Sequence, residues 1–415
     1  MKRLAWMDGL RGLAAMQVVL FHYVSAFFPA IGLLRPKLAH YGWETYFIKT
    51  PLFLPFDGTA AVYLFFIMSG SALTYSFSQR PMAIPSGVLR RIIRLGLPMA
   101  GALVLAAVTL SLFPNARAVA AGMTGSQDWL GAMAPLPVSA GEIAHQIIFE
   151  GMLTGYAGGS FLPYRLTVFL GLTPSWNTYI GPLWTLHIEF VGSMLILALV
   201  AIRSLMGPRV HLAVCIVFTV CFSASTLLLF VVGHVAAPWL GRIPNRPRVA
   251  ALGIVLTIVG IVVCTSKAVD AGKMLRGFLP RAPMGATVSS PDIVTVFGAI
   301  LIFAGIALLP ALQRRMERPA IQWLGRISFS LYLTHFPLLI TAASALFIML
   351  SSSVPFGVAT AATAVMGVFG SCWLASIFER WVDRPSVALS RRIGGQLRLR
   401  PGIPLGLRSR SRITK

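Results

Sequence analysis

The N-terminal stretch MDGLRGLAAMQVVLFHY (7–23) places three ionisable side chains in and just before an apolar run. Arg11 and His22 are eleven residues apart, close to three turns at about 3.6 residues per turn, so they lie on one face of a helix. Asp8 precedes Arg11 by three residues and shares that face. The spacing predicts a stripe with Asp8 and Arg11 at its mouth and an imidazole, which titrates near neutral pH, about three turns deeper.

Each of these side chains also has a structural interpretation. Arg11 could extend its guanidinium to lipid headgroups while pairing with Asp8, and His22 could make an interhelical hydrogen bond. Ionisable groups within an apolar segment are costly and indicate a functional site by default. Their common helix face favours a polar cavity that leads inward.

A pair of arginines begins a later apolar run, in SGVLRRIIRLGLP (86–98). Arg91 and Arg94 are three residues apart and share a helix face. Guanidinium groups bind phosphate bidentately, so the pair suits a phosphorylated ligand. Anchoring to lipid phosphate, as basic residues beside membrane spans do, is an equally good interpretation.

Three more segments place polar groups inside apolar runs. Glu189 lies near the middle of one such run, where a carboxylate must be protonated or paired; His187 falls on the other side of that helix. The run at 324–340 carries Tyr332 and His335, as site residues or as structural hydrogen-bonding groups. In the run 63–77, Ser69 begins a pair of small residues that permits close approach of a helix or a ligand.

The sequence predicts no metal centre. The four cysteines lie in apolar stretches without metal-ligand spacing, and the histidines are scattered over different segments. We interpret the cysteines as small buried apolar side chains.

The composition shows which elements must position these groups. Of the 415 residues, 56% are hydrophobic and 11% are charged, against about 25% charged in a typical soluble domain. Apolar runs long enough to cross a bilayer recur along the chain. The net charge of +23 then reflects loops that contact anionic headgroups. Nucleic-acid binding is not expected, because no soluble module is present to carry it.

We predict an all-α, polytopic transmembrane helix bundle of about ten spans with both termini cytoplasmic. In this topology 141–157 lies at the interface, and the cytoplasmic segments hold 26 basic residues against nine outside, as the positive-inside rule requires. The expected spans are 10–28, 58–79, 91–113, 178–202, two crossings within 209–240, and 248–266, 291–311, 326–349 and 355–379.

The chain then divides into a transmembrane domain, 1–386, and a basic cytoplasmic tail, 387–415. The Gly- and Pro-interrupted tail is expected to be disordered against anionic lipid. The longest outside loop, about 114–177, is expected to cap a polar site at the membrane surface.

Six segments resemble, in order, the motifs of the acyltransferase 3 family, integral membrane acyltransferases that include O-antigen and exopolysaccharide acetylases. Together they extend from residue 4 to about residue 386. Phe190 stands where many members have a second glutamate, and Ser71 replaces a usual apolar residue. The segments are LAWMDGLRGLAAMQVVLFHY, LFFIMSGSALTYSF, RRIIRLGLP, GPLWTLHIEF, ISFSLYLTHFPLL and FERWVDRP.

The resemblance implies a membrane O-acyltransferase of the plasma or inner membrane. It would move an acyl group, usually acetyl, from cytoplasmic acyl-CoA to a sugar hydroxyl of a cell-surface or exported glycan or glycolipid, with no metal. The resemblance does not identify the sugar or the acyl chain. It is compatible both with direct transfer and with a transient acyl-enzyme on His22. On this basis the predicted catalytic residues are His22, Arg11 and Glu189, the acyl-CoA-binding residues are Arg91 and Arg94, and the surrounding cavity includes Asp8, Ser69, Tyr332 and His335.

A transporter for an anionic metabolite is the alternative, with the arginines along its pathway. Secondary transporters often contain internal repeats with broken helices in corresponding positions. The stripe from Arg11 to His22 has no counterpart in the second half of the chain, which favours the transferase.

Overall fold

The computed structural model describes residues 4–79, 84–134, 137–157, 171–172, 174, 177–221, 225–244, 246–268 and 292–396. Within these residues the regular secondary structure is helical, and strand-like pairing occurs only as isolated bridging, for example between Ala157 and Pro174. This confirms the predicted all-α fold.

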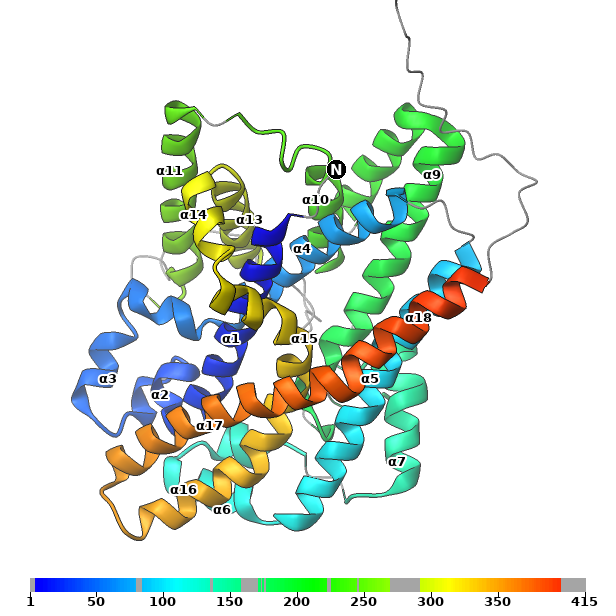
Figure 1. The fold of residues 1–415 in the computed structure, drawn as a ribbon. Helices are drawn as coiled ribbons and strands as arrows, with labels where there is room; N and C mark the ends of the chain where they lie inside the picture. Colours follow the sequence, from blue (N-terminus) through cyan, green and yellow to red (C-terminus); the bar gives the residue numbers. More distant parts are fainter. Residues whose placement is uncertain are drawn as a thin grey trace, which may run out of the picture.

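The helices follow one another in chain order (Figure 1). They are α1 (Ala5–Phe27), α2 (Pro29–Gly32), η1 (Pro36–Leu38), α3 (Gly42–Phe47), η2 (Pro51–Phe56), α4 (Gly58–Gln79), α5 (Ile84–Leu112), α6 (Ala116–Thr124), η3 (Gln127–Gly131), α7 (Ala140–His145), η4 (Gln146–Thr154), η6 (Gly181–Leu183), α9 (Trp184–Cys221), α10 (Leu227–Ala236), α11 (Pro247–Thr265), α13 (Ile293–Ala307), α14 (Pro310–Met316), α15 (Pro319–Leu338), η7 (Leu339–Ala343), α16 (Ser344–Ser351), α17 (Phe356–Phe378), η8 (Glu379–Asp383) and α18 (Arg384–Gln396).

Many of these helices are long and apolar enough to cross a membrane. Among the described residues seven segments meet this condition, and eight do so if α13 and α14, which are bent by 93°, count as one span. The chain is therefore a multi-pass membrane protein. The seven segments are Ala5–Phe27, Gly58–Gln79, Ile84–Leu112, Gly181–Val220, Pro247–Thr265, Pro319–Ser351 and Phe356–Ile393.

The difference from ten spans arises in the segment 209–240, which was expected to cross twice. Helix α9 is kinked at Gly207, whose φ of +84° favours glycine, and the part after the kink ends at Cys221. Helix α10 has only ten residues, whereas a crossing needs about 20. Two full crossings here are therefore not supported by helix length. The orientation of the termini stays a prediction.

Two peripheral segments were also predicted. The segment 141–157 contains α7 and η4, of six and nine residues, which are too short to span a bilayer. Helix α18 continues to Gln396, so the first part of the predicted tail is helical rather than disordered. Residues 397–415 lie outside the described residues.

Helix α1 lies at the centre of the bundle and packs against α15 and α4 (Figure 1). Its contact with α15 is close because both helices have glycine there: a Cβ on Gly12 would collide with the backbone of Gly325. This close approach positions Arg11 and His22 beside polar groups of α15.

Helices α17 and α18, joined by η8, form one long rod that crosses the molecule (Figure 1). Helix α18 packs along α5. The packing places Asp383 of η8 beside Arg94 of α5.

Candidate active site

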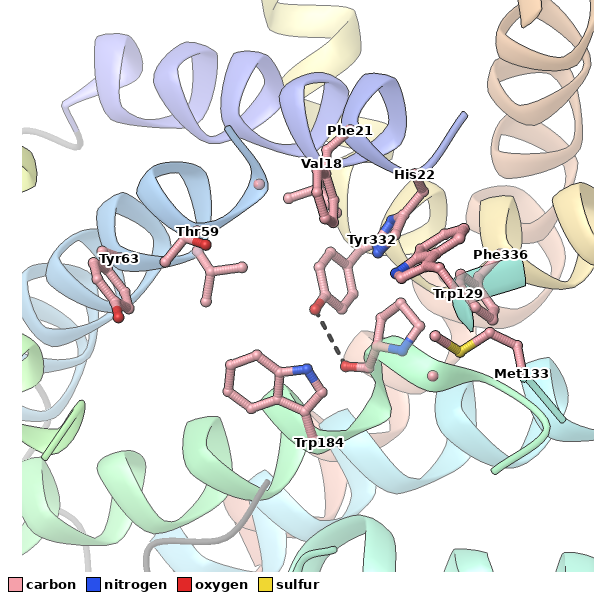
Figure 2. Close-up of a pocket in the computed structure, with 14 residues that line it drawn as sticks. Val18, Phe21, His22, Thr59, Tyr63, Trp129, Met133, Trp184, Tyr332 and Phe336 are labelled. Carbon is pink, nitrogen blue, oxygen red and sulfur yellow. Dashed lines mark hydrogen bonds between the residues drawn. The ribbon is translucent and has the colours of Figure 1, made fainter. Parts of the chain in front are cut away.

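A cavity of about 330 Å³ adjoins the His22 side chain, and Figure 2 shows it surrounded by side chains from α1, α4, α9 and α15. Most of them are apolar or aromatic, as in many sites that bind small organic groups. We call it the histidine cavity. It is lined by Val18, Phe21, His22, Gly58, Thr59, Val62, Tyr63, Trp129, Met133, Gly181, Pro182, Trp184, Tyr332 and Phe336.

His22 is hydrogen-bonded to His335 across the contact between α1 and α15. Nδ1 of His22 lies 2.8 Å from Nε2 of His335, and Nδ1 of His335 lies 2.8 Å from the carbonyl oxygen of Leu331. Because a carbonyl only accepts, Nδ1 of His335 carries the proton, and Nε2 of the neutral ring carries the lone pair. His22 therefore donates through its Nδ1–H.

This hydrogen-bonded chain leaves the lone pair of His22 on Nε2, on the side of the ring away from His335. His22 lines the cavity, whereas His335 is fully buried and does not line it. A neutral imidazole whose tautomer is held by a second group is the usual arrangement of a general base. The geometry thus suits proton removal by His22, with His335 as the positioning residue.

Trp129 covers His22 from the long segment between α5 and α9. Its ring stacks on the imidazole, with centroids 5.7 Å apart and an interplanar angle of 25°. The turn that carries it is tied to α1, because the Ser126 hydroxyl donates to the carbonyl of Ser25 at 2.8 Å. The expectation that 114–177 caps the site agrees with this contact. No sequence pattern indicated that Trp129 is the residue involved.

A second, more polar cavity of about 180 Å³ lies between α1, α4, α5, α9 and α15. Three guanidinium groups line it against one carboxylate, so its surroundings carry an excess of positive charge. We call it the arginine cavity. It is lined by Arg11, Val62, Phe65, Phe66, Ser69, Arg91, Arg94, Leu95, Thr185, Leu186, Glu189, Ser328, Phe329 and Tyr332.

The arginine pair of α5 is held by two carboxylates. Arg91 donates to Glu189 at 2.8 Å, and Arg94 donates to Asp383 of η8. The sequence predicted that Glu189 is either protonated or paired, and the structure shows it paired with Arg91. Neither partner could be identified from the sequence, because the contacts join helices far apart in the chain. Asp383 was missed as a site neighbour for the same reason.

Arg11 faces the same cavity from α1. Its Nε donates to the Ser328 hydroxyl at 3.0 Å, and an amino group donates to the carbonyl of Gly325 at 3.3 Å. The carboxylate of Asp8 is 3.8 Å from the Arg11 guanidinium, as the spacing on one helix face predicts. Asp8 itself lines neither cavity.

Tyr332 and Val62 line both cavities and so form the boundary between them. The Tyr332 hydroxyl lies 2.7 Å from that of Thr185 and 3.2 Å from the carbonyl oxygen of Pro182 (Figure 2). The stripe of α1 is therefore divided: Arg11 faces one cavity and His22 the other. A single continuous cavity was expected from the sequence.

The remaining predicted residues fall on either side of this boundary or away from it. Ser69 lines the arginine cavity and interacts with Glu189. Glu189 lies in that cavity and not beside His22, so the structure separates two predicted catalytic residues. His187 is buried and pairs with the carbonyl of Met152 at 2.8 Å, on the other side of its helix as expected.

Known proteins identify the family of this chain. The sequence model of the acyltransferase 3 family, described as an acyltransferase domain, matches residues 4–380. The O-acetyltransferase PaAT-1 of Phomopsis amygdali is 26% identical over 443 aligned positions, covering 93% of this chain and 84% of the relative. No solved structure is significantly similar. The match across nearly the whole chain, together with its membrane helices, shows that this protein belongs to the acyltransferase 3 family of multi-pass membrane proteins that transfer acyl groups.

Proposed function

We propose that the protein transfers an acyl group, acetyl in the first instance, from cytoplasmic acyl-CoA to a sugar hydroxyl of a cell-surface or exported glycan or glycolipid. One observation carries the proposal: a cavity rich in arginine and a cavity with a histidine base meet at Tyr332 and Val62. A donor with phosphates and an acceptor with a hydroxyl need these two environments.

The arginine cavity has hydrogen-bond donors to spare for the phosphate groups of a coenzyme A. A guanidinium has five N–H donors, and the contacts with Glu189 and Asp383 use a part of them in Arg91 and Arg94. The Nε atom of Arg91 is buried and has no hydrogen-bond partner among the described residues. A cavity of about 180 Å³ holds only part of a coenzyme A, so the nucleotide would extend beyond it.

The histidine cavity suits the acceptor. Its aromatic side chains offer flat apolar surfaces for a sugar ring, and Thr59 and Tyr63 add hydroxyl groups (Figure 2). A sugar hydroxyl is a weak nucleophile at neutral pH, and a positioned base is the means of activating it.

The chemistry follows from the His22–His335 pair. Nε2 of His22 takes the proton of the sugar hydroxyl while the hydroxyl oxygen attacks the thioester carbonyl, the C–O bond forms and the C–S bond breaks. The imidazolium of His22 then returns the proton to the leaving thiolate, so the histidine ends neutral. His335 accepts from Nδ1–H throughout and keeps Nε2 directed away from itself.

Purified protein in lipid vesicles tests the proposal directly. Radiolabelled acetyl-CoA is supplied together with lipid-linked glycans, and free thiol and labelled glycan are both measured. We expect thiol release that depends on the acceptor and is lost in His22→Ala. Uptake of an anion into the vesicles without thioester cleavage would support the transporter instead.

The acceptor class is tested in cells. Mass spectrometry of the envelope and secreted glycans, with the protein present and absent, should show the loss of an acyl ester on one glycan. An unchanged set of glycan esters would contradict the assignment of a cell-surface acceptor, while thiol release in vesicles would still support acyl transfer.

A further inference from the structure

Three metal-ligating side chains converge on one point away from both cavities. His211 and Cys215 lie on α9 after its kink, and His234 lies on α10. Their ligand atoms are all within 4.8 Å of one another. None of the three residues lines the histidine cavity or the arginine cavity.

Nε2 of His211 is close to both of the other side chains. Nε2 of His211 is 2.7 Å from Nε2 of His234 and 3.5 Å from the Sγ of Cys215. A neutral imidazole nitrogen carries either one proton or one lone pair, so it makes one hydrogen bond at a time. One hydrogen bond cannot serve all three atoms. A cation bound between them would interact with the lone pairs of both nitrogens and the sulfur at once.

The tautomer of His234 is the one that a metal ligand requires. The Thr74 hydroxyl has one proton, and it donates this proton to the carbonyl of Gly70 at 2.7 Å. It therefore accepts from the Nδ1–H of His234, which lies 2.7 Å away. Nε2 of His234 is left with its lone pair, directed at His211. Histidines that bind metals are generally oriented in this way, by a hydrogen bond from the other ring nitrogen.

We propose that His211, Cys215 and His234 bind one Zn²⁺ ion, with Thr74 orienting His234. Two imidazoles and a thiolate are typical zinc ligands. Zinc–nitrogen bonds of about 2.0 Å and a zinc–sulfur bond of about 2.3 Å place tetrahedral ligand atoms roughly 3.3 to 3.6 Å apart. The distance of 3.5 Å between Sγ of Cys215 and Nε2 of His211 already lies in this range. The Nε2 atoms of His211 and His234 would need to move apart by about 0.6 Å.

The burial of the three side chains suits an ion that stays bound. The three side chains are 8%, 3% and 3% exposed, for His211, Cys215 and His234 in that order.

The site would join three helices, two of which, α4 and α9, also carry residues that line the cavities. It connects the part of α9 after Gly207 to α10, and Thr74 connects it to α4. A metal that binds only the folded state stabilises that state. The ion would thus fix α10 and the part of α9 after Gly207, both of which are too short to cross the membrane by themselves.

Metal analysis of the purified protein tests the site. The protein is produced with an affinity tag free of histidine, and zinc is measured by mass spectrometry. We expect close to one zinc per chain in the wild type, and less than a tenth of that in Cys215→Ser combined with His234→Gln. The matched control is Cys264→Ser, which removes another buried thiol outside the cluster and should keep its zinc.

A wild-type zinc content no higher than that of the double variant would overturn the proposal. In that case His211 simply donates to His234, and Cys215 packs as a small apolar side chain.

Cobalt substitution keeps the test valid if the double variant fails to fold. Wild-type protein is stripped with a chelator and given Co²⁺, and a thiolate-to-cobalt charge-transfer band in the near ultraviolet is expected. The band should disappear in Cys215→Ser and remain in Cys264→Ser. Its absence from the wild type would contradict a thiolate ligand. The chelator should also lower the Tm of the wild type by several degrees.

Discussion

The arginine cavity and the histidine cavity share two residues and differ in nearly everything else. In the arginine cavity three guanidinium groups are arranged around Glu189 and Ser69. The histidine cavity is bounded mainly by aromatic rings, and the imidazole that lines it is that of His22. The arginine cavity therefore suits a negatively charged ligand, and the histidine cavity suits proton transfer in apolar surroundings, as the proposed function requires.

Helix α1 contributes side chains to both cavities. Arg11 and His22 lie on the same face of α1, yet the side chains of Tyr332 and Val62 separate their surroundings. The apolar boundary keeps the imidazole away from the charges that, in the proposed function, bind the donor. A thioester at the boundary would be within reach of the base while its phosphates stay with the arginines.

The largest expected effect comes from the histidine cavity. His22→Ala should lower kcat for acyl transfer by about 10³-fold, because a positioned base contributes roughly 10² to 10⁴. The Kd for coenzyme A should stay the same, since His22 does not line the arginine cavity. Initial rates with labelled acetyl-CoA and a binding measurement with coenzyme A check both values. If His22→Ala weakened coenzyme A binding as much as it lowered kcat, the two cavities would not have separate functions.

The second prediction concerns the orientation of that base. His335→Leu should lower kcat by roughly 10²-fold, because Nδ1–H of His22 loses its acceptor and the tautomer is no longer fixed. His335→Gln offers a carbonyl oxygen to the same proton and should recover part of the rate. The KM values should change little in both variants. If glutamine rescued nothing, His335 would be a packing residue.

The third prediction concerns the arginine cavity. Removing Arg91 alone would leave Glu189 buried without its partner, which destabilises the protein. We therefore compare Arg91→Ala in the Glu189→Ala background with Glu189→Ala alone. The added change should weaken coenzyme A binding by about tenfold or more, as expected for hydrogen bonds to a charged group. Calorimetric titration measures the two Kd values.

Arg90→Ala is the matched control for that comparison, since Arg90 is the neighbouring arginine and does not line the cavity. Its Kd for coenzyme A should equal that of the wild type. If Arg90→Ala weakened coenzyme A binding as much as Arg91→Ala does, Arg91 and Arg94 would act only as membrane anchors.

The smallest effect is expected at the boundary. Tyr332→Phe keeps the ring and removes the hydroxyl that contacts Thr185 and Pro182, so the rate should fall by roughly fivefold, which corresponds to about 1 kcal/mol. Tyr332→Ala opens the boundary and should increase the rate with longer acyl chains relative to acetyl. A chain-length preference unchanged by Tyr332→Ala would show that the boundary does not control the acyl group.

Much of the fold and part of the site could be predicted from local patterns. Apolar runs interrupted by basic loops indicated an all-α membrane bundle, and most spans match observed helices. The two crossings predicted within 209–240 are not supported, because α10 is too short to span and the kink of α9 at Gly207 depends on packing. The helical start of the tail was missed because its Gly and Pro residues suggested disorder.

The cluster of His211, Cys215 and His234 illustrates the same limit. The four-residue spacing of His211 and Cys215 on one helix face was a signal that sequence analysis could have used. The third residue lies on another helix, 23 positions after His211, and nothing in the sequence indicates that α10 turns it toward α9.

The sequence by itself determined that this is a membrane helix bundle, that its motifs are those of the acyltransferase 3 family, and that Arg11 and His22 lie on one face of a helix. These features depend on composition and helical period, which are local. Only the tertiary structure decided that Glu189 holds Arg91, that His335 orients His22, and that Tyr332 divides the site. Each of those contacts joins helices distant in the chain, and their geometry depends on how closely the helices pack, as at Gly12 and Gly325.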